Sequence, residues 1–333
     1  MKLWFDFTNP PHVNFYYPLI QHYSQPENSV LITAREFVET VKLAEVKGLH
    51  PKVLGKHGGK NRVSKLYSLL SREMLLLNQI SDFDVSLSSN YEAPLASWLK
   101  RKMSLVFDDN DISPNWLYSK FASFVISPEF IDREAMYRMG IKKEQLITYP
   151  GFKENIYAAG YEPDPSFLDN LPFKEFVTVR PENLQASYVP DGAVSIVPEL
   201  IDKLVKSGFN VLYLPRYAAD KAYYNENKQV FIPPAPLNGL DVCYYSNAVL
   251  TGAGTFSREA AVMGTPSVSF FSGKTFLGVD KQMFSEKMVL HSRDSDEIVR
   301  FVRTSSKKGF DQQKSLAVQQ ELFGVVDTLL SKI

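Results

Sequence analysis

A glycine-rich turn near residue 252 is the segment of this chain best suited to chemistry. The apolar run 248–250 predicts a strand, two glycines follow it closely, and the spacing then predicts a helix over 255–263. Glycine lets a backbone turn tightly with its N–H groups exposed. Because the positive end of the helix dipole points to the same place, a phosphate could bind there. The predicted phosphate-binding residues are Gly252, Ala253, Gly254 and Thr255. Such glycines can also serve only to pack a strand against a helix.

Two charged side chains occupy the first turn of that predicted helix. The carboxylate of Glu259 could accept ribose hydroxyls, and the guanidinium of Arg258 could add to phosphate binding. Each also has an ordinary explanation, since Glu is favourable near a helix N-terminus and Arg is common on a solvated face. P-loop spacing is absent, and no Gly-x-Gly-x-x-Gly follows the first predicted strand. These absences argue against an ATPase and against a nicotinamide-dependent dehydrogenase.

Two arginines lie at the ends of the predicted strands that precede this turn. Arg180 ends the predicted strand 175–180, and Arg216 follows the predicted strand 209–215. In open parallel sheets, ligands bind outside the carboxyl ends of the strands. Two guanidiniums there could bracket a diphosphate through paired hydrogen bonds. The second half of the chain is therefore predicted to hold an anion, with Arg180 and Arg216 beside the glycine turn.

The first half presents candidates for acid–base chemistry at its own strand ends. His12 follows the predicted strand 3–7 and could act as a general base or as a donor to substrate. The alternative is a histidine at a helix start, hydrogen-bonded to the backbone. Asp108 and Asp109 follow the apolar strand 104–107. Crowded carboxylates raise at least one pKa, so one of the two could carry a working proton, although turns also favour Asp and Asn.

A second glycine turn, in the segment KHGGK, is flanked by cations. Its central residues could move and close over a bound phosphate or an acidic acceptor, and a solvated basic loop is an equal alternative. The predicted mobile loop comprises His57, Gly58, Gly59 and Lys60. The five histidines lack mutual ligand spacing and a single cysteine cannot build a structural zinc site, so no metal centre is expected.

Composition excludes several classes of protein. The 333 residues carry 37 basic and 37 acidic side chains, and this balance gives no support to a role in coating nucleic acid. The one cysteine, Cys243, favours a reduced, cytoplasmic setting. The N-terminus has no export-signal pattern, and no run of about 18 apolar residues predicts a membrane span. Peripheral membrane contact stays open.

Short apolar runs alternate with helical patterns along the whole chain, which is the rhythm of βαβ units and parallel sheets. The proline- and glycine-rich segment 160–172 interrupts this rhythm and is a predicted linker. The expected organisation is a Rossmann-like domain over 1–159, the linker 160–172, a second Rossmann-like domain over 173–311, and a terminal helix over 312–333 that packs back on the first domain.

The whole chain resembles the archaeal and bacterial family catalogued as domain of unknown function 354. The resemblance lies in the segments FDFTNPPHVNFYYPLI, LITAREF, GKHGGK, SPEF, YPGFKENIY, VRPEN, LPRY and TGAGTFSREAAVMGTPSVSF. That family is similar to the GT-B superfamily, which includes UDP-N-acetylglucosamine 2-epimerases and nucleotide-sugar glycosyltransferases. The resemblance implies an α/β, GT-B-like fold of two doubly wound domains facing across a cleft, with the nucleotide bound by the C-terminal domain.

Residue by residue, the resemblance supports the nucleotide site more than the catalytic one. The Gly252 turn and Glu259 would hold diphosphate and ribose, and Arg180 in VRPEN looks like an Arg of the epimerase segment His-Arg-Arg-Glu-Asn. Epimerases carry Gly-Asp-Thr after the fourth strand, where this chain has residues 89–91, Ser-Asn-Tyr. They carry Glu-Ala-Gly-Leu-Arg where this chain has residues 108–111, Asp-Asp-Asn-Asp. The epimerase set of acids is therefore not intact.

The sequence thus predicts an enzyme, a GT-B-type glycosyltransferase that binds a nucleotide-diphosphate sugar, most simply a UDP-sugar, and transfers the sugar to an unidentified acceptor. His12 or Asp108 would activate the acceptor. No other cofactor and no nucleic acid partner are expected. Two alternatives stay open: a hexosamine 2-epimerase that uses Asp108, Asp109 or Glu92, and a non-catalytic nucleotide-sugar binder. The base, the sugar, the stereochemical outcome and the oligomeric state are not predicted.

Overall fold

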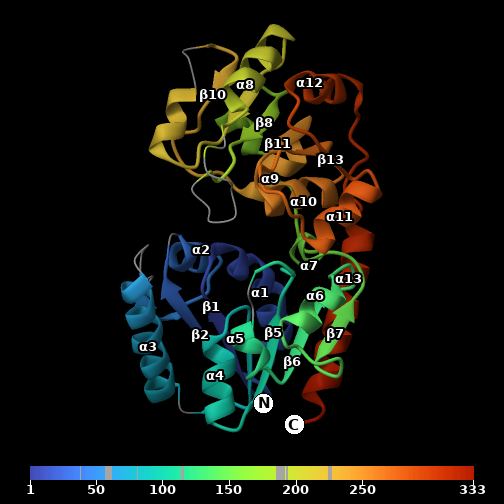
Figure 1. Cartoon of the computed structure of the whole chain (residues 1–333). Helices are drawn as coiled ribbons and strands as arrows, with labels where there is room; N and C mark the ends of the chain where they lie inside the picture. The colour runs from blue at the N-terminus through green and yellow to red at the C-terminus, as the bar shows by residue number, and fades with distance from the viewer. Residues whose placement is uncertain are drawn as a thin grey trace. The chain divides into compact units, whose positions relative to one another are not determined.

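A computed structural model describes residues 1–37, 39–56, 62–80, 82–113, 116–184, 192, 194–223 and 227–333. The chain forms two compact units (Figure 1). Unit 1 comprises Met1–Tyr157 and Leu316–Ile333, and unit 2 comprises Ala158–Ser315. The segment 160–172, the predicted linker, lies within unit 2, where the Tyr161 hydroxyl donates a 2.6 Å hydrogen bond to Asp241. No helix in the described ranges is long and apolar enough to cross a membrane.

Unit 1 is built on a seven-stranded parallel sheet in the order β3-β2-β1-β4-β5-β6-β7. Its strands are β1 (Lys2–Phe7), β2 (Ser29–Glu36), β3 (Lys52–Lys56), β4 (Val85–Ser88), β5 (Met103–Phe107), β6 (Phe124–Pro128) and β7 (Leu146–Tyr149). The helices are α1 (Pro10–Tyr23), α2 (Thr40–Val46), α3 (Arg62–Gln79), α4 (Glu92–Leu99), α5 (Trp116–Ser119), α6 (Arg133–Arg138) and α7 (Lys153–Ala158).

Unit 2 is built on a six-stranded parallel sheet in the order β10-β9-β8-β11-β12-β13. Its strands are β8 (Val177–Arg180), β9 (Val211–Tyr213), β10 (Val230–Phe231), β11 (Ala248–Thr251), β12 (Ser267–Ser269) and β13 (Val289–His291). The helices are α8 (Val197–Lys206), α9 (Gly239–Tyr245), α10 (Gly254–Val262), α11 (Gly278–Ser285) and α12 (Ser295–Thr304), with 3₁₀ turns η1 (Phe167–Asn170) and η2 (Ala218–Tyr223).

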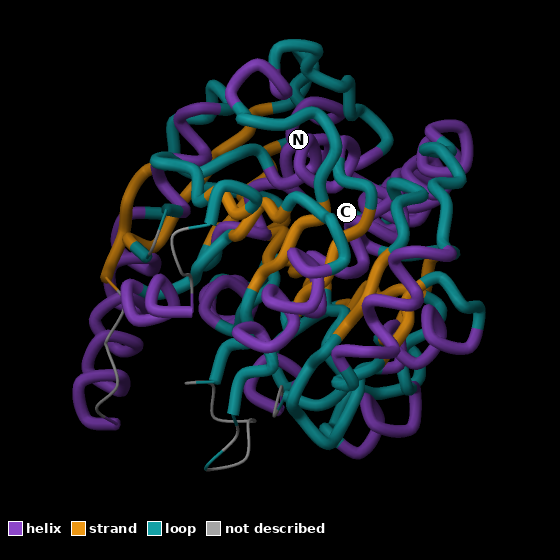
Figure 2. The backbone as a smooth tube through the Cα atoms, turned by 90° about the horizontal axis from the view of Figure 1, so that it is seen from above, coloured by secondary structure: helices purple, strands orange, loops and turns teal. Residues whose placement is uncertain are grey.

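Both sheets are doubly wound, and the predicted α/β architecture is confirmed. Figure 2 shows the strands of the sheets between their covering helices. Burial on both faces explains why apolar side chains occupy successive positions of β1, at Leu3, Trp4 and Phe5, as is typical of strands in such sheets. In each sheet the strand order reverses at one point, between β1 and β4 and between β8 and β11. Ligands of doubly wound folds bind at the carboxyl ends beside that reversal.

The terminal helix α13 (Gln312–Leu330) completes the core of unit 1. Its apolar face joins the same buried cluster as β1 and α1, through Val318, Leu322, Phe323, Val326, Leu329 and Leu330. Gly151 permits this approach, since a Cβ there would lie 2.7 Å from Cγ2 of Val318. The contact positions the segment after β7, which carries a residue of the site described below.

Candidate functional site

A pocket of about 220 Å³ opens at the carboxyl ends of the unit 1 strands. It is lined by Pro11, His12, Phe15, Ser89, Phe107, Asp108, Asp109, Asn110, Ser113 and Lys153. The three predicted catalytic residues therefore share one pocket, although they come from two segments almost a hundred residues apart. The loops after β1 and β5 bring them together because parallel strands end at the same edge of their sheet.

His12 is a neutral imidazole whose proton position follows from its neighbours. Its Nδ1 lies 3.3 Å from the backbone nitrogen of Thr8 and 3.3 Å from the Thr8 hydroxyl. A backbone N–H can only donate, so Nδ1 is the acceptor and Nε2 carries the proton. Burial and the positive charge of Lys153 lower the pKa of His12 to about 3. Near pH 7, His12 can thus donate a hydrogen bond through Nε2, whereas it is poorly suited to the role of base.

Asp108 is the group in this pocket that is best suited to move a proton. Burial raises its pKa to about 7, and the negative charge of Asp109 acts in the same direction. Two donors hold the pKa down: the Tyr118 hydroxyl and the backbone N–H of Asn110, which lies 2.9 Å from Oδ1. A carboxyl group with a pKa near the working pH serves well as a general base or acid. The raised pKa predicted for this acidic cluster is assigned to Asp108.

Asp109 is held in an ion pair that sequence patterns did not reveal. Nζ of Lys153, the first residue of α7, lies 2.7 Å from Oδ2 of Asp109, and both side chains are largely buried. The pair puts a fixed cation beside His12 and Asp108 and affects the pKa of each. Lys153 belongs to the YPGFKENIY segment. Its position just after β7, at the carboxyl end of a strand, is the feature of the sequence that could have marked it as a site residue. The Lys153 ammonium group could bind an anionic group of a substrate.

A buried ionic network lies behind the pocket, at the reversal between β1 and β4. Nη2 of Arg72 lies 2.6 Å from Oδ1 of Asp6, and its Nη1 lies 3.2 Å from Oε1 of Glu92. Asn90 donates a 2.7 Å hydrogen bond to the other oxygen of Asp6. These side chains are fixed by one another. Glu92, the acid considered for an epimerase, is paired with Arg72 in this network and does not line the pocket.

In unit 2, Arg180 ends β8 and Arg216 follows the neighbouring strand β9, and Nε of Arg216 donates a 3.0 Å hydrogen bond to the carbonyl of Pro181, the residue after Arg180. Burial lowers the pKa of Arg180, and the positive charge of Arg216 lowers it further. The buried Nε of Arg180 has no hydrogen-bond partner in the described part of the chain. Its guanidinium carbon lies 5.5 Å from the centre of the Phe256 ring, on α10. Two nearby guanidiniums beside a helix start make a site where an anion would be stabilised.

Gly252 and Ala253 form the backbone turn that leads from β11 to α10. The N–H of Gly252 donates to the carbonyl of Arg180 at 3.1 Å, and the N–H of Ala253 donates to Oγ1 of Thr251 at 2.9 Å. These two amides are therefore used within the fold, contrary to the expectation that they are exposed. Glycine is required at 252 because a Cβ there would lie 2.6 Å from Cα of Glu182.

The amides at the start of α10 are the remaining candidates of this turn for binding an anion. The helix begins at Gly254, Thr255 is its second residue, and Ala253 before them supplies no side-chain cap. The first N–H groups of a helix lack partners within the helix, and without a cap they remain able to bind an anion. The predicted anion site thus reduces to the amides at 254–255 and the two arginines.

Arg258 and Glu259 have different surroundings. Arg258 is buried, and its Nη1 lies 2.7 Å from Oδ1 of Asp280 on α11, so the guanidinium is tied into a structural ion pair. Glu259 is only partly buried, and its charge acts on Arg180. Of the two side chains, Glu259 is the better placed to contact a ligand held by Arg180.

Two further expectations concern the loop and metals. The predicted mobile loop, His57, Gly58, Gly59 and Lys60, lies outside the described residues. Within the described ranges, no group of three or more His, Cys, Asp or Glu side chains is arranged to hold a metal ion.

Comparisons with known proteins place this geometry in context. An uncharacterized protein of Methanocaldococcus jannaschii is 28% identical over 326 residues, which cover 92% of each chain. Among solved structures, the UDP-GlcNAc 2-epimerase from Methanocaldococcus jannaschii has a TM-score of 0.72 at 12% identity, covering 99% of this chain and 100% of that one. The S. aureus MnaA–UDP co-structure has a TM-score of 0.70 at 12% identity, covering 100% and 97%.

The Anabaena HepE structure in complex with UDP and glucose has a TM-score of 0.64 at 15% identity, covering 98% of this chain and 99% of that one. At these identities the similarity shows the fold, which is GT-B-like. The family model described as "Protein of unknown function (DUF354)" matches residues 1–331. The chain therefore belongs to the DUF354 family.

Proposed function

We propose that the protein is a GT-B-type glycosyltransferase that binds a nucleotide-diphosphate sugar, with UDP as the nucleotide, and transfers the sugar to an acceptor. The observation that carries the proposal is the pair Arg180 and Arg216 beside the uncapped start of α10. Structures of the same fold were solved with UDP, with UDP-GlcNAc and UDP, and with UDP and glucose. The fold is shared with nucleotide-sugar enzymes, and the two arginines supply cationic groups that could bind a diphosphate.

In the proposed complex, unit 2 holds the leaving group. The guanidiniums of Arg180 and Arg216 and the first amides of α10 would bind the diphosphate oxygens, because each supplies donors to negative charge. Glu259 would accept hydrogen bonds from the ribose hydroxyls. Charge that develops on the diphosphate as the sugar leaves would meet donors that are already in place, which is the usual source of the largest rate effect.

Unit 1 would supply the proton acceptor. The Asp108 carboxylate takes the proton of the acceptor hydroxyl while that oxygen forms a bond to the anomeric carbon of the sugar. The bond from that carbon to the β-phosphate oxygen breaks, and its electron pair leaves with the nucleoside diphosphate. His12 donates through Nε2 to an oxygen of the sugar or the acceptor, and Lys153 holds Asp109 and balances its charge.

A hexosamine 2-epimerase is the second candidate. The observation in its favour is that two carboxyl groups, Asp108 and Asp109, line one pocket with different environments. One of them could remove the proton at the carbon next to the anomeric centre and another group could return it. Several structures of the same fold are UDP-GlcNAc 2-epimerases.

One incubation experiment separates the candidates. The protein is incubated in D₂O with UDP-GlcNAc, UDP-glucose or a guanosine diphosphate sugar, with and without a panel of hydroxyl acceptors, and the products are analysed by mass spectrometry. Release of UDP with a sugar–acceptor product supports the transferase. Deuterium at C2 of recovered hexosamine, without net UDP release, supports the epimerase and contradicts the transferase. Binding of a nucleotide sugar with no turnover would identify a non-catalytic binder.

A further inference from the structure

Unit 1 carries a concentration of cations at the edge of its sheet opposite the pocket. The turns that lead into β5, β6 and β7 and the end of α13 contribute Lys100, Arg101, Lys120, Lys142, Lys143 and Lys332, here called the basic edge. All are exposed except the half-buried Lys100. The chain as a whole has a formal net charge of zero, so this is a local excess.

The acidic residues nearby do not cancel this charge. Glu144 lies in the same turn as two of the lysines. Oδ1 of Asp84 lies 3.9 Å from Nζ of Lys102, and Asp82 forms an ion pair with Lys2. Both acids are therefore paired with cations outside the basic edge. By residue type these turns hold more cations than acids, so the basic edge carries a local excess of positive charge. An anionic partner would find complementary charge there.

The six cations belong to one region of the unit because their segments converge where the strands begin. Turns that enter neighbouring parallel strands lie at one edge of the sheet, as those before β5, β6 and β7 do. Nζ of Lys332 lies 4.8 Å from the centre of the Phe124 ring, at the first residue of β6. The end of α13 therefore reaches the same edge. In Figure 1 both chain termini lie at this end of unit 1.

Exposed apolar side chains adjoin the basic edge. Trp98 is 56% exposed and Leu99 is 49% exposed, at the end of α4 directly before Lys100. The Trp98 ring contacts Phe121, in the turn before β6, with ring centroids 5.4 Å apart. A partly exposed tryptophan beside lysines is suited to the interface of a lipid bilayer. Its apolar ring can contact the acyl chains while its N–H group faces the polar headgroups.

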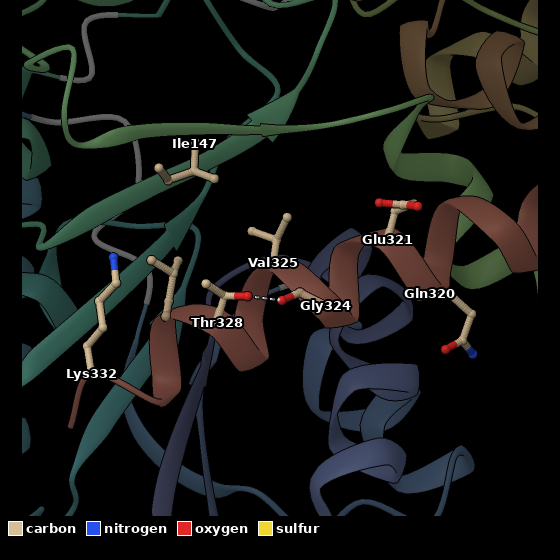
Figure 3. A pocket seen from close by; sticks show the side chains of 8 residues that line it. Ile147, Gln320, Glu321, Gly324, Val325, Thr328 and Lys332 are labelled. Atoms are coloured by element: carbon tan, nitrogen blue, oxygen red, sulfur yellow. Dashed lines mark hydrogen bonds between the residues drawn. The ribbon is translucent and has the colours of Figure 1, made fainter.

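A groove between β7 and α13 adds apolar surface beside Lys332 of the basic edge. It encloses about 490 Å³ and is lined by Ile147, Gln320, Glu321, Gly324, Val325, Thr328, Leu329 and Lys332 (Figure 3). Its aliphatic side chains come from both elements, and Lys332 lies at one end of the row. The Thr328 hydroxyl donates to the Gly324 carbonyl at 2.8 Å, so its proton is used within the helix.

We propose that the basic edge docks unit 1 on the surface of an anionic lipid bilayer. Lysine and arginine side chains would contact headgroup phosphates, and Trp98 and Leu99 would enter the interfacial layer. Nucleic acid would use the same cations, but it offers no apolar layer for Leu99. The combination of a cationic rim with exposed aromatic and aliphatic side chains therefore favours lipid over other polyanions.

The proposal predicts a specific dependence on charge and salt. Each cation near an anionic leaflet strengthens binding about fivefold, and the attraction falls off within a Debye length. Binding should thus require anionic lipid and should weaken strongly as salt rises. Turnover of a water-soluble nucleotide sugar should not change in variants of the basic edge, since no residue of it lines the pocket.

Vesicle flotation of the full chain tests the proposal. Vesicles of phosphatidylglycerol with phosphatidylcholine are compared with vesicles of phosphatidylcholine alone, at 50 mM and 500 mM salt. We expect flotation with the anionic vesicles at low salt, little at high salt, and none with phosphatidylcholine alone. Failure of the wild-type protein to float with anionic vesicles at low salt would overturn the proposal.

Matched variants locate the contact. Lys142→Glu with Lys143→Glu should lower the affinity for anionic vesicles at least 25-fold, at about fivefold for each cation removed. The control, Lys206→Glu with Lys228→Glu, makes the same charge change at exposed positions of unit 2 and should bind like the wild type within twofold. Equal loss in both doubles would show that net charge alone matters and would contradict a docking face.

A second pair of variants tests the lipid assignment. Trp98→Ser should weaken vesicle binding, whereas Val46→Ser, at another exposed apolar position on a helix of unit 1, should not. Circular dichroism confirms that each variant is folded. If the wild-type protein binds single-stranded RNA as tightly as anionic vesicles, and Trp98→Ser changes neither affinity, the surface is a general polyanion site and the lipid assignment is wrong.

Discussion

Nδ1 of His12 lies 3.3 Å from the backbone nitrogen of Thr8, and this contact decides what the histidine can do. Since Nδ1 must accept, the neutral ring carries its proton on Nε2, and the low pKa keeps it neutral. The sequence allowed either a base or a donor at this position. The geometry favours a donor and leaves the proton transfer to Asp108.

Two variants of His12 distinguish a donor from a base. His12→Ala should lower kcat about 10²-fold to 10³-fold, as loss of one donor to a developing charge does. His12→Gln keeps an N–H donor at a similar reach and should recover at least tenfold of that loss. Steady-state kinetics, with UDP affinity measured in parallel as the control, checks this. Equal defects in both variants would contradict the donor role.

The pH dependence of activity should follow Asp108. Its pKa is about 7, and the base must be deprotonated to accept the acceptor proton, so kcat/KM should fall as the pH drops below 7. Tyr118→Phe removes a hydrogen bond that stabilises the carboxylate, and it should move the inflection to higher pH. A pH–rate profile of both proteins checks the shift. An inflection that stays in place would exclude Asp108 as the titrating group.

Glu73 should make the fold sensitive to alkali. Its carboxyl oxygens are buried and accept no hydrogen bond from the described residues, and burial with the charge of Glu92 raises its pKa to about 8 from 4.5. The folded state binds the proton more tightly than the unfolded state, so stability is fully present below pH 4.5 and is lost as the pH rises through 8. The loss is on the order of 4 kcal/mol.

Denaturant unfolding at pH 5 and pH 9 measures this effect. Glu73→Gln removes the titrating proton while preserving shape, so its stability should change far less between the two values than that of the wild type. Glu199→Gln, at an exposed carboxyl on α8, serves as the control and should keep the wild-type dependence. A wild-type protein whose stability is equal at both pH values would contradict the assignment.

Gly252 should be intolerant of a side chain. A Cβ there would lie 2.5 Å from Cγ and 2.6 Å from Cα of Glu182, which itself accepts hydrogen bonds from Ser195 and Arg293. Gly252→Ala should cost about 2 kcal/mol or more and should weaken UDP binding, because strain of this size displaces the turn. Gly160→Ala meets no atom within 4 Å and should be nearly neutral. Thermal unfolding of the two variants gives the comparison.

Sequence patterns predicted the elements well where they are long or strongly apolar. The predicted strand 3–7 matches β1, and the predicted helix 255–263 agrees with α10 to within one residue at each end. Helix α1 begins at Pro10, soon after β1, because proline fits the first positions of a helix. The three-residue β13 and the short helices α9 and α11 were not predicted, since their patterns are too brief to show a period.

Side-chain partners could not be predicted in the same way, because they come from distant segments. Lys153 meets Asp109 from 44 residues away, and no local pattern links them. Arg258, expected at the phosphate, is satisfied by Asp280, 22 residues further on. The grouping of residues at strand ends was predictable because the carboxyl ends of parallel strands lie at the same edge of their sheet. The choice between a structural and a functional role for a charge depends on neighbours that only the fold supplies.

The central claim is that unit 2 binds a nucleoside diphosphate through Arg180 and Arg216. Titration calorimetry with UDP on the wild type, Arg180→Gln, Arg216→Gln and the control Arg300→Gln tests it most directly, since Arg300 is an exposed arginine of α12 in the same unit. The account predicts saturable binding by the wild type and the control, and at least tenfold weaker binding by each of the other two variants. No binding by the wild type, or equal affinity in all four proteins, would contradict it.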